Sequence, residues 1–236
     1  MTATSLVILA VVDLFAIAAF GQSALVETNH SPAVNASTAV AETNSPAVDH
    51  ETATNAWSFS ASVLGYFVHD SRDYAQPTIT ADRGLLHLEA RYNYEALETG
   101  SAWLGCNFGA GEKLAWELTP MLGGVFGDKT GIAPGYKGSL SWWKLDLYSE
   151  GEYFAEIGHS SGNFFYNWSE LTISPFDWFR FGLVTQRTRA YQTDREMQRG
   201  LLFGVTWHRV DLATYLFNLD ETHPTIVLGI RFSFGK

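Results

Sequence analysis

The end of the chain alternates strictly between apolar side chains and polar or small ones. In residues 225–234 one parity is occupied by Ile226, Leu228, Ile230, Phe232 and Phe234, and the other by Thr225, Val227, Gly229, Arg231 and Ser233. Because successive side chains of a β-strand point to opposite faces, this pattern predicts a strand with one continuous apolar face. In a water-soluble protein a second protein layer covers such a face, whereas in a membrane barrel the lipid covers it.

The same alternation recurs through residues 57–236, and no segment there shows sustained helical spacing. The clearest further strand is residues 86–95, in which apolar or aromatic side chains alternate with His87, Glu89, Arg91, Asn93 and Glu95. Four ionisable groups on one face of a strand need water or partners. We therefore expect an all-β chain whose strands have one apolar and one polar face.

The connections between the expected strands alternate in length. Counting back from Phe234, long connections are expected at 218–224, 192–199, 158–163, 127–135, 96–100 and 69–73, and tight ones at 208–210, 175–177, 143–144, 109–113 and 81–84. Outer-membrane barrels have short periplasmic turns, longer extracellular loops and an even number of strands. We therefore expect an antiparallel up-and-down transmembrane β-barrel of about twelve strands. If the segment 74–80, which contains Pro77, is a loop, parity requires ten strands.

Aromatic side chains gather where the expected strands meet their turns, as in the interfacial girdles of membrane barrels. They are Trp57, Tyr66, Phe67, Trp142, Trp143, Trp168, Trp178, Phe179 and Trp207. The alternative is a soluble β-barrel or sandwich with an aromatic core, which requires polar outer faces that these strands lack.

Residues 57–236 thus resemble a bacterial outer-membrane β-barrel protein, and the most specific match is the C-terminal end. Gly229, Phe232 and Phe234 stand at the spacing of the β-signal that the barrel-assembly machinery reads in such proteins. Two features depart from that signal, because Val227 occupies a usually polar position and two residues follow Phe234. The resemblance implies the outer membrane of a Gram-negative-type bacterium. It implies outer-membrane lipid, lipopolysaccharide and the assembly machinery as partners.

Two segments precede the expected barrel. Residues 1–24 are predicted to be a signal peptide, because residues 5–20 are almost continuously apolar and small residues follow them. The usual basic start is missing, since the first basic residue is Arg72, and an uncleaved anchor helix is the alternative. Residues 25–56 contain an imperfect duplication and no aromatic side chain, so we expect a disordered periplasmic leader.

The composition excludes several classes of function. The formal net charge is -10, and all Lys and Arg lie in residues 57–236, where no basic cluster forms a nucleic-acid footprint. The single cysteine, Cys106, excludes an intrachain disulfide and is expected to be buried or lipid-facing. The seven His are scattered without metal-ligand spacing, so we expect no metal and no cofactor.

The polar strand faces assign a set of ionisable side chains to the lumen. They are His87, Glu89, Arg91, Glu95, Glu117, Asp146, Glu150, Glu152, Glu156, Glu170, Arg180 and Arg231. If these charges pair across a closed interior, they only hold the barrel in shape. If water remains inside, the acidic excess favours cations. We therefore expect either a narrow passive channel that prefers cations or a structural wall protein, with a plugged surface-binding barrel as an alternative.

Two extracellular loops carry further candidate chemistry. Residues 159–163, His-Ser-Ser-Gly-Asn, are similar to the site of the outer-membrane phospholipase and lipid A deacylase barrels, in which His159 would take the proton of Ser161. Gly162 departs from that pattern, and the composition also suits a plain loop, so we expect no enzyme. The other loop is flanked by Arg187, Arg189, Arg195 and Arg199. These guanidinium groups could bind lipopolysaccharide phosphates or pair with neighbouring acids.

Overall fold

The computed structural model of the chain describes residues 56–67, 72–158, 162–190, 196–220 and 224–235. The chain divides into two compact units, Met1–Ala39 and Val40–Lys236. The first unit, with the expected signal peptide, lies outside the described residues, and so does residue range 40–55 of the expected leader. None of the described segments forms a helix that is long and apolar enough to cross a membrane.

The described part of the second unit is built from strands. They are β1 (Ser58–Phe67), β2 (Tyr74–Arg83), β3 (Leu86–Tyr92), β4 (Thr99–Cys106), β5 (Phe108–Ala110), β6 (Leu114–Gly127), β7 (Gly131–Trp142), β8 (Leu145–Glu156), β9 (Phe164–Phe176), β10 (Phe179–Ala190), β11 (Glu196–Trp207), β12 (Val210–Phe217) and β13 (Thr225–Gly235).

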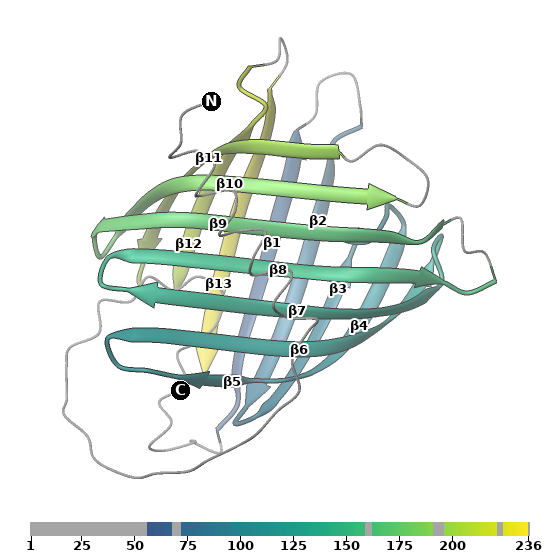
Figure 1. Cartoon of the computed structure of the whole chain (residues 1–236), viewed down its shortest axis with the longest axis horizontal. Helices are drawn as coiled ribbons and strands as arrows, with labels where there is room; N and C mark the ends of the chain where they lie inside the picture. Colours follow the sequence, from purple (N-terminus) through teal and green to yellow (C-terminus); the bar gives the residue numbers. More distant parts are fainter. Residues whose placement is uncertain (1–55, 68–71, 159–161, 191–195, 221–223, 236) are drawn as a thin grey trace. The chain divides into compact units, whose positions relative to one another are not determined.

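These strands close into a barrel (Figure 1). Apart from β4 and β5, which do not pair with each other, each strand pairs antiparallel with its sequence neighbours, and the last strand, β13, pairs with the whole length of β1. The short β5 continues β4 after a break at Asn107, since both pair with β6. The two therefore share one position in the wall, and the barrel has twelve strand positions. The expected closed antiparallel barrel of about twelve strands is confirmed, and the ten-strand alternative is wrong.

The two ends of the barrel differ in their connections. One end, here called the turn end, has the short turns at 84–85, 111–113, 143–144, 177–178 and 208–209. Four of these turns begin with a residue of positive φ, at Gly84, Gly111, Trp143 and His208, as is usual in tight hairpins. The other end, called the loop end, has the longer connections 68–73, 93–98, 157–163, 191–195 and 218–224. In outer-membrane barrels the end with longer loops is extracellular.

Some strand boundaries differ from the sequence-based expectation. β2 is a full strand of ten residues, and Pro77 lies just outside its ladder with β3, which begins at Thr78. The long loop expected at 127–135 is short, because β7 already begins at Gly131. The glycines of this segment leave room for neighbouring side chains, since a Cβ on Gly131 would meet the Phe154 ring at 2.6 Å.

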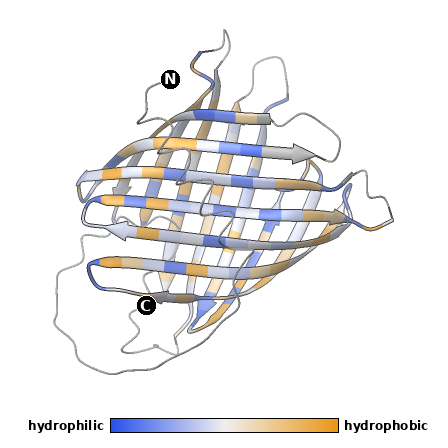
Figure 2. Cartoon of the chain, viewed as in Figure 1, coloured by the Kyte–Doolittle hydropathy of each residue, from blue (hydrophilic) through white to orange (hydrophobic). Residues whose placement is uncertain are grey.

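The outer face of the barrel is apolar, and hydropathy alternates along each strand (Figure 2). Exposed large side chains on this face include Phe59, Val63, Ile79, Leu88, Leu104, Leu122, Phe126, Leu183, Phe203, Leu212, Leu228 and Phe232. Cys106 is also exposed. Trp142, Trp143, Trp178 and Trp207 are exposed at or next to three turns of the turn end, 143–144, 177–178 and 208–209. Trp168, which the sequence placed in a girdle, is instead buried inside the barrel.

A small polar network around Tyr136 lies on the outer face, which is otherwise mostly apolar. The Tyr136 hydroxyl lies 3.1 Å from the Ser149 hydroxyl and accepts a bond of 3.0 Å from Asn167 Nδ2. The Ser149 hydroxyl also lies 3.0 Å from that of Ser169. The Tyr136 ring covers Gly151, where an added Cβ would meet it at 2.9 Å. These groups satisfy one another, which a polar group facing hydrocarbon requires.

Candidate functional site: the barrel lumen

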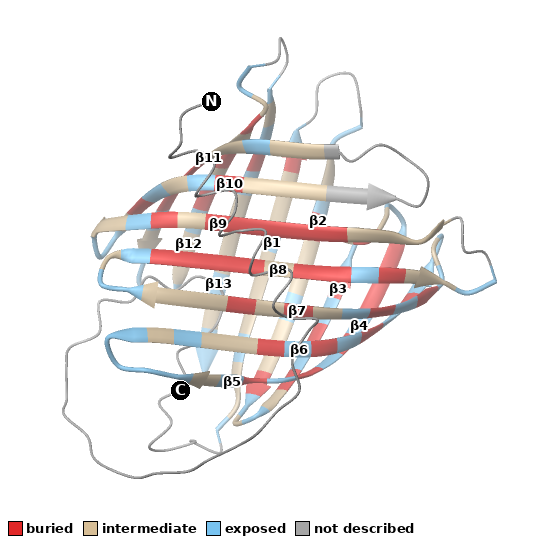
Figure 3. Cartoon of the chain, in the orientation of Figure 1, coloured by how far each residue is buried: buried red, intermediate tan, exposed pale blue. Residues whose placement is uncertain are grey.

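The inner face of the barrel carries the polar and charged side chains. Buried positions follow β8 and β9 through much of their length (Figure 3). Of the residues that the sequence assigned to the lumen, the following are buried: His87, Glu89, Arg91, Glu95, Asp146, Glu152, Glu170 and Arg180. The partly buried members of that set are Glu117, Glu150, Glu156 and Arg231. Glu95 is not on a strand but in the connection 93–98, because β3 ends at Tyr92.

Arg91 is the centre of a charge network that crosses the lumen. Its Nε donates to Glu89 Oε1 on the same strand, and its Nη1 donates to Glu152 Oε2 on β8 at 3.0 Å. Lys137 on β7 donates to the other oxygen of Glu89. Since β3 and β8 are not neighbours in the sheet, the Arg91–Glu152 bond spans the interior. The network therefore connects separate parts of the wall across the lumen and narrows the passage.

His87 connects this network to the turn end. Its Nδ1 lies 2.7 Å from Asp82 Oδ1, and its Nε2 lies 3.0 Å from Glu89 Oε2. Asn107, at the break between β4 and β5, donates to the same Asp82 oxygen at 2.7 Å, and Thr119 donates to Asn107. A continuous chain of polar contacts thus runs from the turn end of the wall to the middle of the lumen.

Two carboxylates are held by neutral aromatic donors instead of by Lys or Arg. Glu150 accepts a hydrogen bond from the Tyr94 hydroxyl and one of 2.7 Å from the Tyr148 hydroxyl. Glu170 accepts bonds from Trp168 Nε1 at 2.8 Å and from the Tyr215 hydroxyl at 3.1 Å. In the described chain, no Lys or Arg nitrogen forms a salt bridge with either group. Both can therefore serve as acceptors for a cation.

The connection 93–98 at the loop end folds into the lumen. Tyr94 reaches Glu150 on β8, and the Arg91 guanidinium lies over the Tyr94 ring at 4.1 Å and over the Trp103 ring at 4.5 Å. Glu95 accepts a bond of 2.6 Å from Ser101, which in turn accepts one from Trp103 Nε1. The segment 93–98 is thus anchored on the inner wall, and it narrows the lumen at the loop end.

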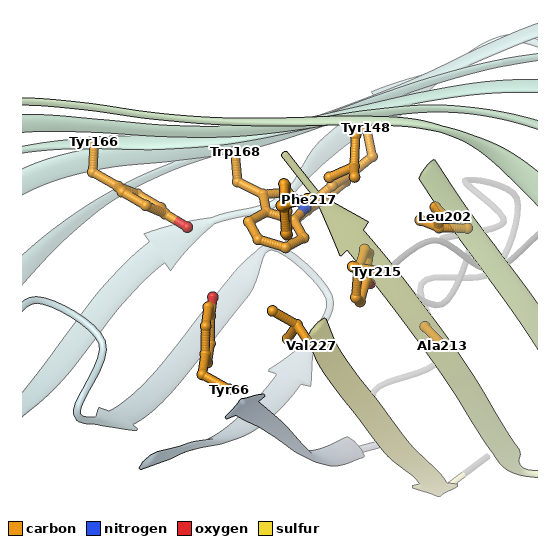
Figure 4. Packing of buried hydrophobic residues seen from close by; sticks show 10 residues of the cluster. Tyr66, Tyr148, Tyr166, Trp168, Leu202, Ala213, Tyr215, Phe217 and Val227 are labelled. Carbon is orange, nitrogen blue, oxygen red and sulfur yellow. The ribbon is translucent and has the colours of Figure 1, made fainter. Parts of the chain in front are cut away.

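Aromatic and aliphatic side chains fill much of the loop-end half of the lumen (Figure 4). Rings from β8 and β9 point toward rings and aliphatic groups from β1, β12 and β13. Trp168 meets Tyr215 and Phe217 edge to face at 5.0 and 5.5 Å. Tyr66 stacks on Tyr74 at 4.6 Å. Any solute that crosses this half must pass between tightly packed aromatic walls.

A cavity of about 60 Å³ remains in the lumen. On one side its walls are hydroxyl groups of β1 and β2, including Ser60, Ser62, Thr78 and Thr80. On the other sides they are charged and aromatic groups, including Glu89, Tyr94, Lys137, Tyr148, Glu150, Trp168, Glu170, Tyr215 and Arg231. A polar cavity of this size has room for several water molecules.

Three lumen charges were missed by the sequence analysis: Asp82, Lys137 and Asp211. Asp211 accepts a two-pronged bond from Arg180, with Nη2 to Oδ1 at 2.7 Å, and a bond of 2.8 Å from Thr206. All three lie in segments that the sequence assigned to connections or their edges. If the alternation of inward and outward side chains had been continued to the observed end of each strand, it would have placed all three residues in the lumen.

The remaining candidate residues lie elsewhere. Gly229 is on the inner face of β13, and Phe232 and Phe234 are exposed on the outer face, where Phe234 stacks on Phe59 at 5.9 Å. His159 and Ser161 lie outside the described residues, so the hydrolase stays a hypothesis.

The arginines proposed for lipopolysaccharide are only partly described. Arg199 is exposed, and it shares the outward parity of Phe203 on β11. Arg187 is partly buried on the outer side of β10, across from Asn167. The side chain of Arg189 and all of Arg195 lie outside the described part of the chain. The contact with lipopolysaccharide therefore stays a prediction.

Among the described residues, no group of three or more His, Cys, Asp or Glu is placed to hold a metal ion. The lumen groups instead bind one another and line a polar cavity. This arrangement can bind a small polar solute.

Comparison with known proteins rests on structure, since no protein-family model and no curated protein matches the sequence. The barrel is similar to the KdgM porin, with a TM-score of 0.55, 9% sequence identity, and coverage of 74% of this chain and 99% of that one. A KdgM porin in complex with disordered oligogalacturonate matches with a TM-score of 0.54, 8% identity and the same coverage. The Omp33 protein of Acinetobacter baumannii gives 0.46 at 9% identity, over 76% and 99% of the two chains. The barrel has the fold of the KdgM porin, and the outer-membrane β-barrel fold that the sequence resemblance implied is confirmed.

Proposed function

We propose that the chain is an outer-membrane channel, a narrow passive pore that prefers cations. The observation that carries this proposal is the polar cavity inside a closed barrel whose outer face is apolar. Dry cavities in proteins are lined by apolar groups, whereas a cavity lined by carboxylates, hydroxyls and a guanidinium holds water. A structural wall protein has no need of a hydrated interior.

The contacts across the lumen indicate that only small solutes can pass. The Arg91–Glu152 bond and the Tyr94–Glu150 bond both reach across the interior. Aromatic rings fill the loop-end half around them. Barrels of this strand number lie between those that side chains fill and those with wide channels. The pore therefore conducts ions in small steps and excludes large solutes.

The distribution of charge supports a preference for cations. Carboxylates on the inner wall outnumber Lys and Arg, and Glu150 and Glu170 have only neutral donors as partners. An acidic wall in a low-dielectric enclosure concentrates cations. The KdgM complex contains oligogalacturonate, a chain of acidic sugars. The excess of acid here favours cations over such a polyanion.

Planar bilayer recordings test this proposal. Purified, refolded protein should give small current steps, and the reversal potential in a KCl gradient should show cation preference. Glu150→Gln combined with Glu152→Gln should lower that preference, because both carboxylates line the narrow part of the lumen. Asp177→Asn removes a charge from an exposed turn and should leave the reversal potential unchanged.

Flat current traces at all voltages from correctly folded protein would instead support a plugged barrel. If the double variant conducts and is as cation-selective as the wild type, the proposal that Glu150 and Glu152 contribute to cation preference is refuted.

A further inference from the structure

Some of the charged groups that line the cavity in the lumen form no salt bridge within the described residues. Arg231, on β13, lines it and is partly buried. The other inward-facing cations each form a salt bridge within the described residues: Arg91 with Glu89 and Glu152, Lys137 with Glu89, and Arg180 with Asp211. Arg231 has none there. A guanidinium that forms no salt bridge and lines a partly open cavity is suited to bind a carboxylate through two parallel hydrogen bonds.

A second wall of the same cavity offers acceptors. Glu150 and Glu170 are each held by two neutral donors and have no Lys or Arg within salt-bridge distance in the described chain. These hydrogen bonds fix the positions of the two side chains at the wall of the cavity. The rings of Trp168 and Tyr215 flank them, and such rings attract a cation electrostatically. This wall is suited to an ammonium group.

Gln76 provides independent support for a ligand in this cavity. Its side chain lines the cavity, is only 8% exposed, and is anchored by a bond of 2.9 Å from Nε2 to the carbonyl oxygen of Asn93. Its Oε1 is buried and has no hydrogen-bond partner. A buried acceptor that lacks a donor costs free energy, and a ligand N–H removes that cost.

We propose that this cavity is a binding subsite for a small zwitterion of amino-acid size, a molecule that carries both a carboxylate and an ammonium group. The carboxylate binds Arg231 on β13, and the ammonium group binds Glu150 on β8 and Glu170 on β9. The proposal names a solute class for the lumen and so rests on the proposed channel function. A simple ion satisfies one of these walls, whereas a zwitterion satisfies both.

Equilibrium dialysis tests the site without requiring any current. The refolded barrel in detergent is dialysed against radiolabelled alanine, propionate or ethylamine, which carry both charged groups, the carboxylate alone or the ammonium alone. Alanine should bind at least tenfold more tightly than either of the others. Arg231→Gln should reduce alanine binding to the level of ethylamine, and Glu170→Gln to the level of propionate.

A matched control is Arg209→Gln, an exposed arginine in a turn, which should leave alanine binding unchanged. Equal binding of the three probes would overturn the proposal, because the cavity then holds water and ions only. Equal loss in Arg209→Gln and Arg231→Gln would also overturn it. Tight alanine binding by a barrel that passes no current would support the subsite and refute the channel, so the two proposals fail separately.

Discussion

At the scale of single residues, the interior is organised around a few side chains that each hold several others. Arg91 contacts two carboxylates and lies over two aromatic rings, although it is only 5% exposed. The period-2 pattern of residues 86–91 was enough to predict that Arg91 and Glu89 face inward. No sequence pattern could indicate that Glu152 is the partner, because sixty-one residues separate the two and only barrel closure brings them together.

We predict that Arg91→Met strongly destabilises the barrel. The substitution leaves Glu89 and Glu152 buried without their shared cation, and breaking a buried ion pair in this way costs about 3 to 5 kcal/mol. Urea unfolding of the protein in lipid vesicles measures the loss. Lys113→Met, in an exposed turn, is the control and should change stability by less than about 0.5 kcal/mol. Identical unfolding midpoints for the two variants would contradict this account.

At the scale of strands, the faces were predictable and several ends were not. Tight turns at 143–144 and 208–209 follow directly from the breaks in alternation. The start of β7 was missed because glycine and proline in residues 131–135 indicate a loop. In the barrel those glycines make room for rings on neighbouring strands, so packing across strands overrides local propensity.

Gly123 and Gly124, adjacent on β6, allow a matched test of this packing. A Cβ on Gly123 would lie 2.6 Å from the buried Trp103 ring, whereas a Cβ on Gly124 meets nothing within 4 Å. Gly123→Ala should therefore cost about 1 to 3 kcal/mol through overpacking. Gly124→Ala should be neutral or slightly stabilising, since alanine has less backbone entropy to lose.

The readout for this pair is again the urea midpoint in vesicles. Equal stability of Gly123→Ala and Gly124→Ala would contradict the packing of Trp103 over β6. It would also contradict the narrow lumen beside Arg91, because the Arg91 guanidinium lies over the Trp103 ring.

At the scale of the whole molecule, the closed sheet has two chemically different faces, and these faces determine where lipid and solute can lie. The outer face is apolar apart from the self-satisfied network around Tyr136 and the arginines of β10 and β11, and the inner face holds the charges. Strand number and orientation followed from the alternation of long and short connections together with parity. The degree of filling of the lumen did not, because it depends on how Trp168, Tyr215 and Tyr94 pack from strands distant in the sequence.

The central claim is that lipid hydrocarbon covers the outer face, and spin labels test it most directly. After Cys106→Ser, single cysteines at Leu122 or Leu183, both exposed on the outer face, are spin-labelled and the protein is reconstituted in phospholipid vesicles. A label at Lys113, in an exposed turn, is the reference for water. The account predicts that oxygen dissolved in the lipid relaxes the outer labels far more than a water-soluble nickel chelate does. Outer labels that the chelate relaxes as strongly as the Lys113 label would contradict it.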